Sequence, residues 1–203
     1  MDLGLKGKNA IVTGGAAGIG LGCSKALAAE GCNIIVADLN EELAAEKAKE
    51  ISSEFGVQAW GVKLDVCDRE KINEFWAFVK ENIGVADILV NNVGGRISRA
   101  PLNELEDSAW LKTFDLTIHS GFFMSKEFCN QFVPTKGKGA IINVTSKSAL
   151  MPTSKGNSHY SSAKAAVIGM TRILAKDVYD LGIRVNCIAP GYVQTERVYP
   201  DGD

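Results

Sequence analysis

Three side chains of this sequence have the types and spacing needed to move a proton while an alcohol and a ketone interconvert. Tyr160 and Lys164 stand four residues apart in a segment with helical periodicity, so they share a helix face. A phenol has a pKa of about 10, and lowering it to about 7 requires about 4 kcal/mol of phenolate stabilisation. The Lys164 ammonium can supply part of that stabilisation, and the Ser146 hydroxyl can hydrogen-bond the substrate oxygen.

A glycine-rich loop near the N-terminus has the pattern of a phosphate-binding turn. Residues 13–20 read T-G-G-A-A-G-I-G, between a short apolar segment and a helical one. Glycines permit a tight turn and close approach of a ligand, and the N–H groups at the following helix start can bind a pyrophosphate. A plain strand–helix turn is the alternative, but the strand–loop–helix context is the one that a dinucleotide site requires.

Asp38 ends the second apolar segment and favours NAD over NADP. A carboxylate at this place can accept hydrogen bonds from both ribose hydroxyls of adenosine, and it would repel a 2′-phosphate. The next residues, Leu39 and Asn40, carry no positive charge, and Ala17 places no cation in the glycine loop. Capping of the next helix is the alternative role for Asp38, although Asn40 can do this instead.

Short apolar segments alternate with amphipathic ones along the chain. The expected strands are Asn9–Thr13, Asn33–Ala37, Val57–Leu64, Asp87–Asn91, Ala140–Val144 and Arg184–Ile188. The expected helices are Ile19–Glu30, Glu41–Phe55, Arg69–Asn82, Ala109–Phe132 and Ser158–Tyr179. Apolar strands separated by helices indicate a parallel sheet covered on both faces. We therefore expect one Rossmann-like, doubly wound α/β domain over residues 1–203, with the chemistry at the carboxyl ends of its strands.

Composition narrows the class of protein. The chain has 203 residues, a net charge of −2 and 46% hydrophobic residues, which is ordinary for a globular enzyme and gives no electrostatic reason to expect nucleic acid or an anionic membrane as partner. Five scattered cysteines without a C-x-x-C pair predict no metal site and fit a reducing cytoplasm. No signal-peptide pattern and no apolar run of about 20 residues is present, so a cytoplasmic enzyme is expected.

Further motifs follow the other expected strands: Asp65-Val66, Asn91-Asn92-Val93-Gly94, and Pro190-Gly191 followed by Thr195. Together with the glycine loop, Asp38, Ser146 and the Y-x-x-x-K pair, they resemble the short-chain dehydrogenase/reductase family in its NAD-dependent form. The resemblance implies an alcohol dehydrogenase or carbonyl reductase that acts on a small secondary alcohol or ketone, with Tyr160 as acid/base. It also implies that Asp65 and Val66 contact the adenine, that Asn91 supports the sheet and that Lys164 holds the nicotinamide ribose. Pro190, Val193 and Thr195 would contact the nicotinamide side.

The expected cofactor-binding residues can be given in full. They are Gly14, Ala17, Gly18, Ile19, Gly20, Asp38, Leu39, Asp65, Val66, Asn92, Gly94, Tyr160, Lys164, Pro190, Gly191, Val193 and Thr195. The expected catalytic residues are Ser146, Tyr160, Lys164 and Thr117, and Ser148 is a rival for the serine role.

The chain departs from the family pattern at two places. Thr117 stands where the family has an Asn that holds a water between the active-site Lys and bulk solvent, and a hydroxyl can serve such a water only in part. Either the backbone holds the water and Thr117 is a tolerated variant, which we favour, or the proton path is altered. The sequence also stops at Asp203, before the family's last strand and most of its substrate loop, so six strands are expected. A homodimer or homotetramer is implied for a complete chain.

Several interpretations stay open. A cofactor-binding sensor without turnover and a reductase of 3-oxoacyl thioesters are the alternatives to the dehydrogenase. Arg96 and Arg99 follow the Asn91–Gly94 motif and could attract an acidic substrate, although two arginines in a loop are more often solvated surface. His159 adjoins Tyr160 but cannot share its helix face, which favours a structural role.

Overall fold

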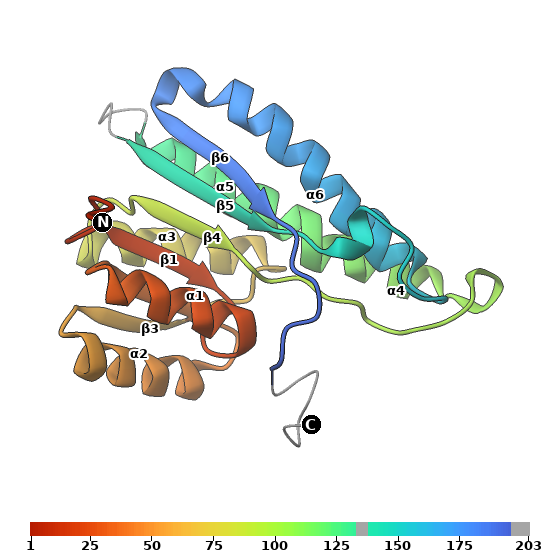
Figure 1. Cartoon of the computed structure of the whole chain (residues 1–203), viewed down its shortest axis with the longest axis horizontal. Coiled ribbons are helices and arrows are strands. Elements are labelled where there is room, and N and C mark those ends of the chain that lie inside the picture. Colours follow the sequence, from red (N-terminus) through yellow and green to blue (C-terminus); the bar gives the residue numbers. More distant parts are fainter. Residues whose placement is uncertain (133–137, 196–203) are drawn as a thin grey trace.

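A parallel β-sheet forms the centre of the molecule (Figure 1). This computed structural model describes residues 1–132 and 138–195. Its strands are β1 (Asn9–Thr13), β2 (Asn33–Asp38), β3 (Ala59–Lys63), β4 (Ile88–Asn91), β5 (Gly139–Val144) and β6 (Ile183–Ile188). They pair in parallel in the order β3-β2-β1-β4-β5-β6. The predicted Rossmann-like sheet is therefore confirmed, and Figure 1 shows the arrowheads of β1, β4, β5 and β6 on one side of it.

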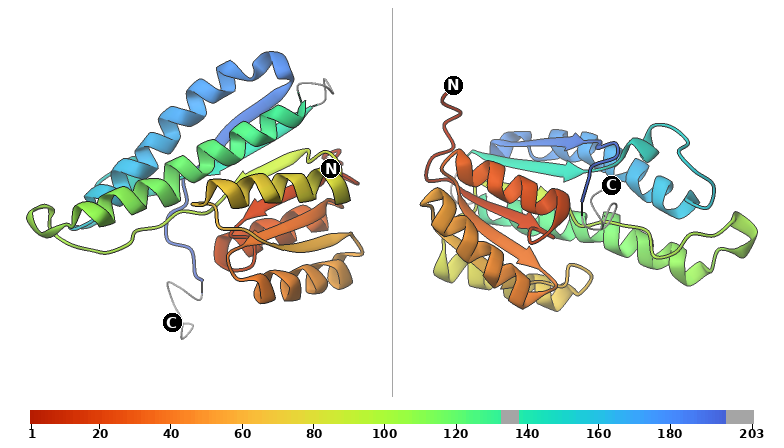
Figure 2. Two further views of the ribbon diagram at one scale, coloured as in Figure 1. Left: turned by 180° about the vertical axis from the view of Figure 1, so that it is seen from behind. Right: turned by 60° about the horizontal axis from the view of Figure 1, so that its bottom comes forward.

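Helices cover both faces of this sheet (Figure 2). They are α1 (Gly18–Ala29), α2 (Glu41–Phe55), α3 (Arg69–Asn82), α4 (Asp107–Phe114), α5 (Ser120–Phe132) and α6 (Ser158–Asp177). Short 3₁₀ turns span Leu102–Glu104, Lys147–Ala149 and Tyr179–Leu181. One apolar cluster joins the strands to α1 and α2, and a second joins them to α3, α5 and α6. In the part of the chain that the structure describes, no helix has the length and apolarity to cross a bilayer.

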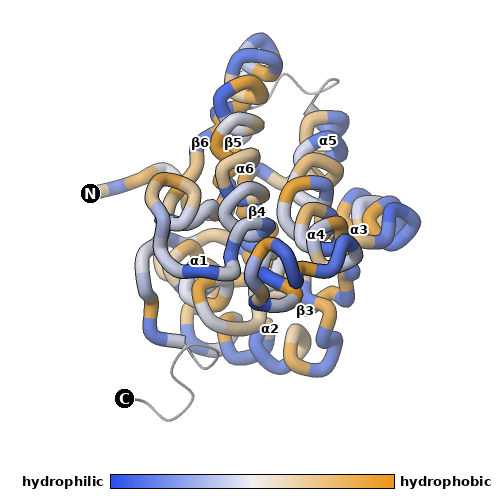
Figure 3. The backbone as a smooth tube through the Cα atoms, turned by 90° about the vertical axis from the view of Figure 1, so that its right-hand side faces the viewer, coloured by the Kyte–Doolittle hydropathy of each residue, from blue (hydrophilic) through white to orange (hydrophobic). Residues whose placement is uncertain are grey.

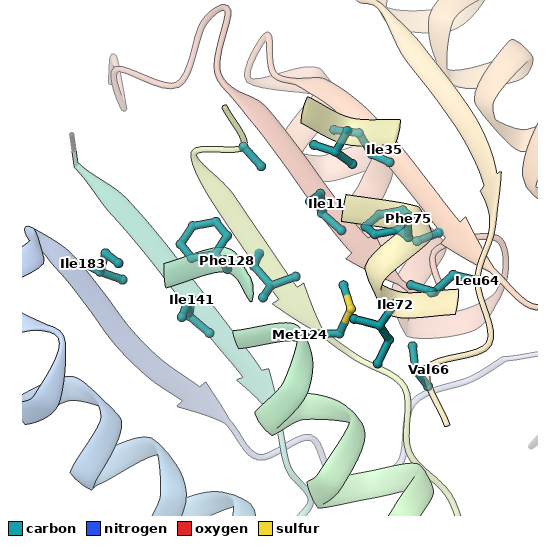
Figure 4. Packing of buried hydrophobic residues seen from close by; sticks show 14 of the residues in the cluster. Ile11, Ile35, Leu64, Val66, Ile72, Phe75, Met124, Phe128, Ile141 and Ile183 are labelled. Atoms are coloured by element: carbon teal, nitrogen blue, oxygen red, sulfur yellow. The ribbon is translucent and has the colours of Figure 1, made fainter. Parts of the chain in front are cut away.

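The second cluster is the larger core and fixes the strands against three helices. Ile11 and Ile141 of the sheet are fully buried beside Phe75 of α3 and Phe128 of α5 (Figure 4). Each such side chain contributes about 2 kcal/mol by leaving water. Hydrophobic and hydrophilic residues alternate along the helix tubes in Figure 3, as expected for helices with one face on a core.

The segment predicted as one helix over Ala109–Phe132 is helical throughout, but it contains a π-helical turn that was not predicted. A π-helical turn, Asp115–His119, separates α4 from α5, and the N–H of Ser120 donates to the carbonyl of Asp115, five residues back. Such a turn holds one residue more than an α-helical turn, and it is often found at functional sites. On either side of the turn, α4 packs against α6 and α5 lies on the sheet.

The other differences lie at element ends. The third strand is Ala59–Lys63, shorter than the predicted Val57–Leu64, and α6 ends at Asp177 before a 3₁₀ turn. The second strand extends to Asp38, so this carboxylate still belongs to the sheet edge. The predicted start of the substrate loop at Glu196 lies outside the described residues.

Candidate active site

The glycine loop after β1 is tightly folded and leaves the start of α1 open. Gly14 and Gly18 have φ angles of +60° and +52°, in the left-handed region that residues other than glycine rarely adopt. A Cβ built on Gly20 would lie 1.9 Å from the Gly14 carbonyl oxygen, so only glycine fits there. Ala17 precedes α1 in an extended conformation and offers no capping side chain. The first N–H groups of α1 are therefore placed to bind an anion.

Asn92, predicted as a cofactor residue, holds the glycine loop in place. Its Nδ2 donates to the carbonyl oxygens of Thr13 at 2.9 Å and Gly14 at 3.2 Å. Its backbone N–H donates to Thr13 Oγ1 at 3.0 Å. The loops after β1 and β4 are thus tied together, a contact between distant segments that no local sequence pattern indicates.

Asp38 lies beside the glycine loop at the end of β2. Its carboxylate accepts one hydrogen bond from the N–H of Ala16 at 3.2 Å and another from the N–H of Asn40 at 3.1 Å. Asn40 caps α2 by accepting from the N–H of Leu43, so the capping role belongs to Asn40 as predicted. The next predicted residue, Leu39, is exposed.

Lys164 is buried at the carboxyl end of β5. Only 3% of its surface is exposed, and its Nζ donates to the carbonyl oxygen of Val144 at 2.7 Å. The Thr145 hydroxyl donates back to the Lys164 carbonyl at 2.6 Å, which fixes α6 to the strand end. Burial lowers the pKa of the Lys164 ammonium to about 8. Tyr160 lies one turn earlier on the same helix and is half-buried.

Ser146 stands two residues after the end of β5 and caps the 3₁₀ turn Lys147–Ala149, against which α6 packs. It is 9% exposed, and its Oγ accepts a hydrogen bond from the N–H of Ser148 at 3.2 Å. The rival hydroxyl of Ser148 is paired with Thr153 Oγ1 at 2.9 Å. The Ser146 hydroxyl therefore still has its proton to donate, whereas the Ser148 hydroxyl is already paired with another hydroxyl.

Gly94 and Thr117 approach the lysine from two other segments. A Cβ built on Gly94 would lie 2.6 Å from Lys164 Nζ and 3.5 Å from the Thr117 methyl carbon. Thr117 is 3% exposed, and within the described residues its Oγ1 has no hydrogen-bond partner. His119 instead bonds to Asp115 through Nδ1 at 2.7 Å and is exposed.

A buried hydrogen-bond network supports this end of the sheet. Asn91 Nδ2 donates to Ser125 Oγ and to Asn143 Oδ1, each at 2.9 Å. Asn143 Nδ2 donates to Thr171 Oγ1 at 2.9 Å. The network joins β4, β5, α5 and α6 through buried side chains, and within the described residues Asn91 Oδ1 is left without a partner. Buried hydrogen bonds of this kind rigidify a site. Asn91 is placed as predicted, whereas Asn143, Ser125 and Thr171 were missed because polar residues in these positions look like ordinary element ends.

The remaining predicted residues surround the same edge of the sheet. Asp65 and Val66 follow β3, and a Cβ built on Gly18 would lie 3.4 Å from the Thr195 methyl carbon. The Pro190 carbonyl accepts from the first N–H of the 3₁₀ turn after β5 at 3.0 Å. Gly191 and Val193 are exposed. Across residues 1–132 and 138–195, no group of three or more His, Cys, Asp or Glu side chains could hold a metal.

Comparisons with known proteins agree with this arrangement. The family model described as short chain dehydrogenase matches residues 8–201. Galactitol 2-dehydrogenase of Agrobacterium fabrum is 37% identical over 193 residues, covering 95% of this chain and 73% of that enzyme. The (S)-acetoin-forming diacetyl reductase of Staphylococcus epidermidis is 35% identical over 189 residues, covering 93% and 72%. The structure of L-sorbose reductase from Gluconobacter frateurii, complexed with NADPH and L-sorbose, has a TM-score of 0.91 and 32% identity, covering 100% and 80%. The chain therefore belongs to the short-chain dehydrogenase/reductase family and is an oxidoreductase of secondary alcohols and ketones that uses a nicotinamide cofactor.

Proposed function

We propose that this protein transfers a hydride between NAD(H) and a secondary alcohol or ketone, with Tyr160 as the proton donor and acceptor. The observation that carries the proposal is the buried Lys164 ammonium one helical turn from Tyr160. Among the described residues its hydrogen-bond partner is a neutral carbonyl, that of Val144, and no carboxylate pairs with it. A buried ammonium that lacks a carboxylate partner stabilises negative charge that develops near it, and Tyr160 lies one helical turn away.

The other residues orient the substrate oxygen. The Ser146 hydroxyl accepts from a backbone N–H, which leaves its own proton free to donate to that oxygen. Tyr160 then exchanges a proton with the same oxygen. The buried polar network behind β4 and β5 keeps both elements rigid, which limits the reorganisation needed during the reaction.

The described residues fit a dinucleotide. The uncapped start of α1 and the cramped Gly14–Gly20 turn suit a pyrophosphate, and the carboxylate of Asp38 suits ribose hydroxyls. Gly94 leaves space beside Lys164 that a Cβ would fill. When bound, the nicotinamide supplies or accepts the hydride.

Substitution of Tyr160 by Phe tests the assignment. The variant keeps the ring and loses the proton, so ketone reduction should fall by at least about 100-fold, the lower range of acid catalysis. NADH binding, followed by the change in cofactor fluorescence, should stay within about 2-fold of the parent, a change of about 0.4 kcal/mol. Survival of turnover in Tyr160→Phe would disprove this role, and binding without turnover in the parent would favour the sensor.

The proposed preference for NAD rests on Asp38, because a carboxylate beside the glycine loop would repel a 2′-phosphate. The L-sorbose reductase is described with NADPH, so the relatives do not decide the cofactor. In Asp38→Asn, which keeps a hydrogen-bond acceptor but loses the charge, the ratio of kcat/KM for NAD over NADP should drop by about 10-fold or more. Equal use of both cofactors by the parent protein would contradict the proposal.

We also propose that residues 1–203 form one cytoplasmic domain, and that a complete chain assembles as a homodimer or homotetramer. Five free cysteines fit a reducing compartment. Trp110, Leu111 and Phe122 expose apolar surface on α4 and α5, which a second copy could cover. Light scattering after gel filtration measures the assembly, and a monomer at micromolar concentration would contradict it.

A further inference from the structure

Two loops that adjoin residues of the candidate site, one after Gly94 and one before Tyr160, are held together by hydrogen bonds. They are residues 95–101, which follow β4, and residues 152–159, which lead into α6, and both lie at the right of the sheet in Figure 1. His159 is fully buried, and its Nε2 donates to the Ser98 carbonyl at 3.1 Å, because a carbonyl can only accept. Tyr160 follows directly, so this loop pair is fixed beside the reacting phenol.

Two arginines form the other bonds of the loop pair, and both bind neutral acceptors. Arg96 Nη1 donates to Asn157 Oδ1 at 3.1 Å. Arg99 Nε donates to the Lys155 carbonyl at 3.1 Å. Neither guanidinium forms an ion pair within the described residues. Each guanidinium is therefore tethered by a hydrogen bond, and no acidic side chain of residues 1–132 or 138–195 pairs with it.

Further positive charge lies on the turn that follows β5. Lys147 follows Ser146, and its ammonium lies 3.7 Å from the centroid of the Tyr192 ring. A cation–π contact does not neutralise the charge. Asn157 precedes α6, yet its side chain makes no capping bond, because its Oδ1 accepts from Arg96. The positive end of the α6 dipole therefore adds to the same field.

We propose that the substrate carries a carboxylate or phosphate group, and that Arg96 binds it at the mouth of the site. This inference rests on the proposed function and adds the substrate class to it. Arg96 uses Nη1 for Asn157, which leaves the Nε and Nη2 edge for a two-point contact with an anion. Arg99 and Lys147 contribute to the attraction without touching the anion.

Matched ketones that differ in charge test the proposal. Acetoacetate is compared with its neutral methyl ester, and dihydroxyacetone phosphate with dihydroxyacetone, each with NADH. The parent should show about 10-fold or higher kcat/KM for at least one of the two anions over its neutral partner, and the ratio should fall with rising salt. The pair that shows the preference distinguishes a carboxylate from a phosphate.

Variants locate the effect. Arg96→Gln keeps a donor for Asn157 but removes the charge, so the anion preference should drop by about 10-fold, mainly through KM. Arg96→Lys should recover part of it, and Arg172→Gln, at an exposed position of α6, should leave the ratio unchanged. Equal or better use of both neutral ketones would overturn the substrate class, and a preference that survives in Arg96→Gln would overturn the role of Arg96. Failure to reduce any of the four ketones, despite intact NADH binding, would instead count against both the proposed function and this inference.

Discussion

Replacement of Lys164 by Met measures the free-energy cost of keeping the buried Lys164 ammonium charged in the folded protein. Burial lowers the pKa of Lys164 from 10.5 to about 8, which corresponds to about 3 kcal/mol against the charged form in the folded state. Between these two values the unfolded chain binds the proton more tightly, so the stability of the parent rises with pH across this window. At pH 7 almost the whole penalty is present, and at pH 9.5 about 1.4 kcal/mol of it remains. The free energy of unfolding of the parent, relative to Lys164→Met, should therefore increase by about 2 kcal/mol between pH 7 and 9.5.

Urea unfolding followed by tryptophan fluorescence provides the measurement. The variant also leaves the Val144 carbonyl without its donor, but this loss is the same at both pH values and cancels in the comparison. Lys176→Met, an exposed lysine in the last turn of α6, controls for loss of a positive charge as such. A difference between parent and Lys164→Met that stays constant, or shrinks, as the pH rises would refute the argument that burial destabilises this ammonium.

Three further substitutions probe the geometry of the site. Gly20→Ala would place a Cβ 1.9 Å from a backbone oxygen, so it should lower the free energy of unfolding by about 1–3 kcal/mol and abolish cofactor binding. Gly22→Ala is the control, because a Cβ there would have no atom within 4 Å, and its stability in urea unfolding should be unchanged or slightly higher. Thr117→Val removes a buried hydroxyl without a partner in the described residues, so the free energy of unfolding should stay within about 1 kcal/mol of the parent or increase; a larger loss would show that the hydroxyl is bonded in solution. Gly94→Ala would press on the buried ammonium at 2.6 Å, so kcat should fall at least about 10-fold in ketone reduction, and an unchanged kcat would contradict the contact.

The strands and the glycine loop could be predicted because their signals are local. A β-branched apolar run such as Ile34–Val36 has one plausible conformation beside a helix-forming segment. Gly20 is required by a contact within its own loop. The relation of Tyr160 to Lys164 needed only the period of a helix.

The features that were missed depend on segments far apart in sequence. The π turn at Asp115–His119 contains neither glycine nor proline, so nothing local distinguishes it from an α-helix. The bond from Arg96 to Asn157 joins residues 61 positions apart, and a loop arginine gives no sign of its acceptor. The burial of Lys164 could not be predicted from the sequence either, because lysines are rarely buried. It becomes evident only in the structure, where Lys164 packs at the end of β5.

The π turn has a consequence for how this enzyme can vary. Because it holds one residue in excess, deletion of a single position between Asp115 and His119 would restore ordinary helical spacing while α4 and α5 kept the faces they present. Thr117 thus lies in a π turn whose extra residue can be deleted without changing the fold. Lineages could add or discard a group over the buried lysine by a one-codon change, without rebuilding the sheet beneath it.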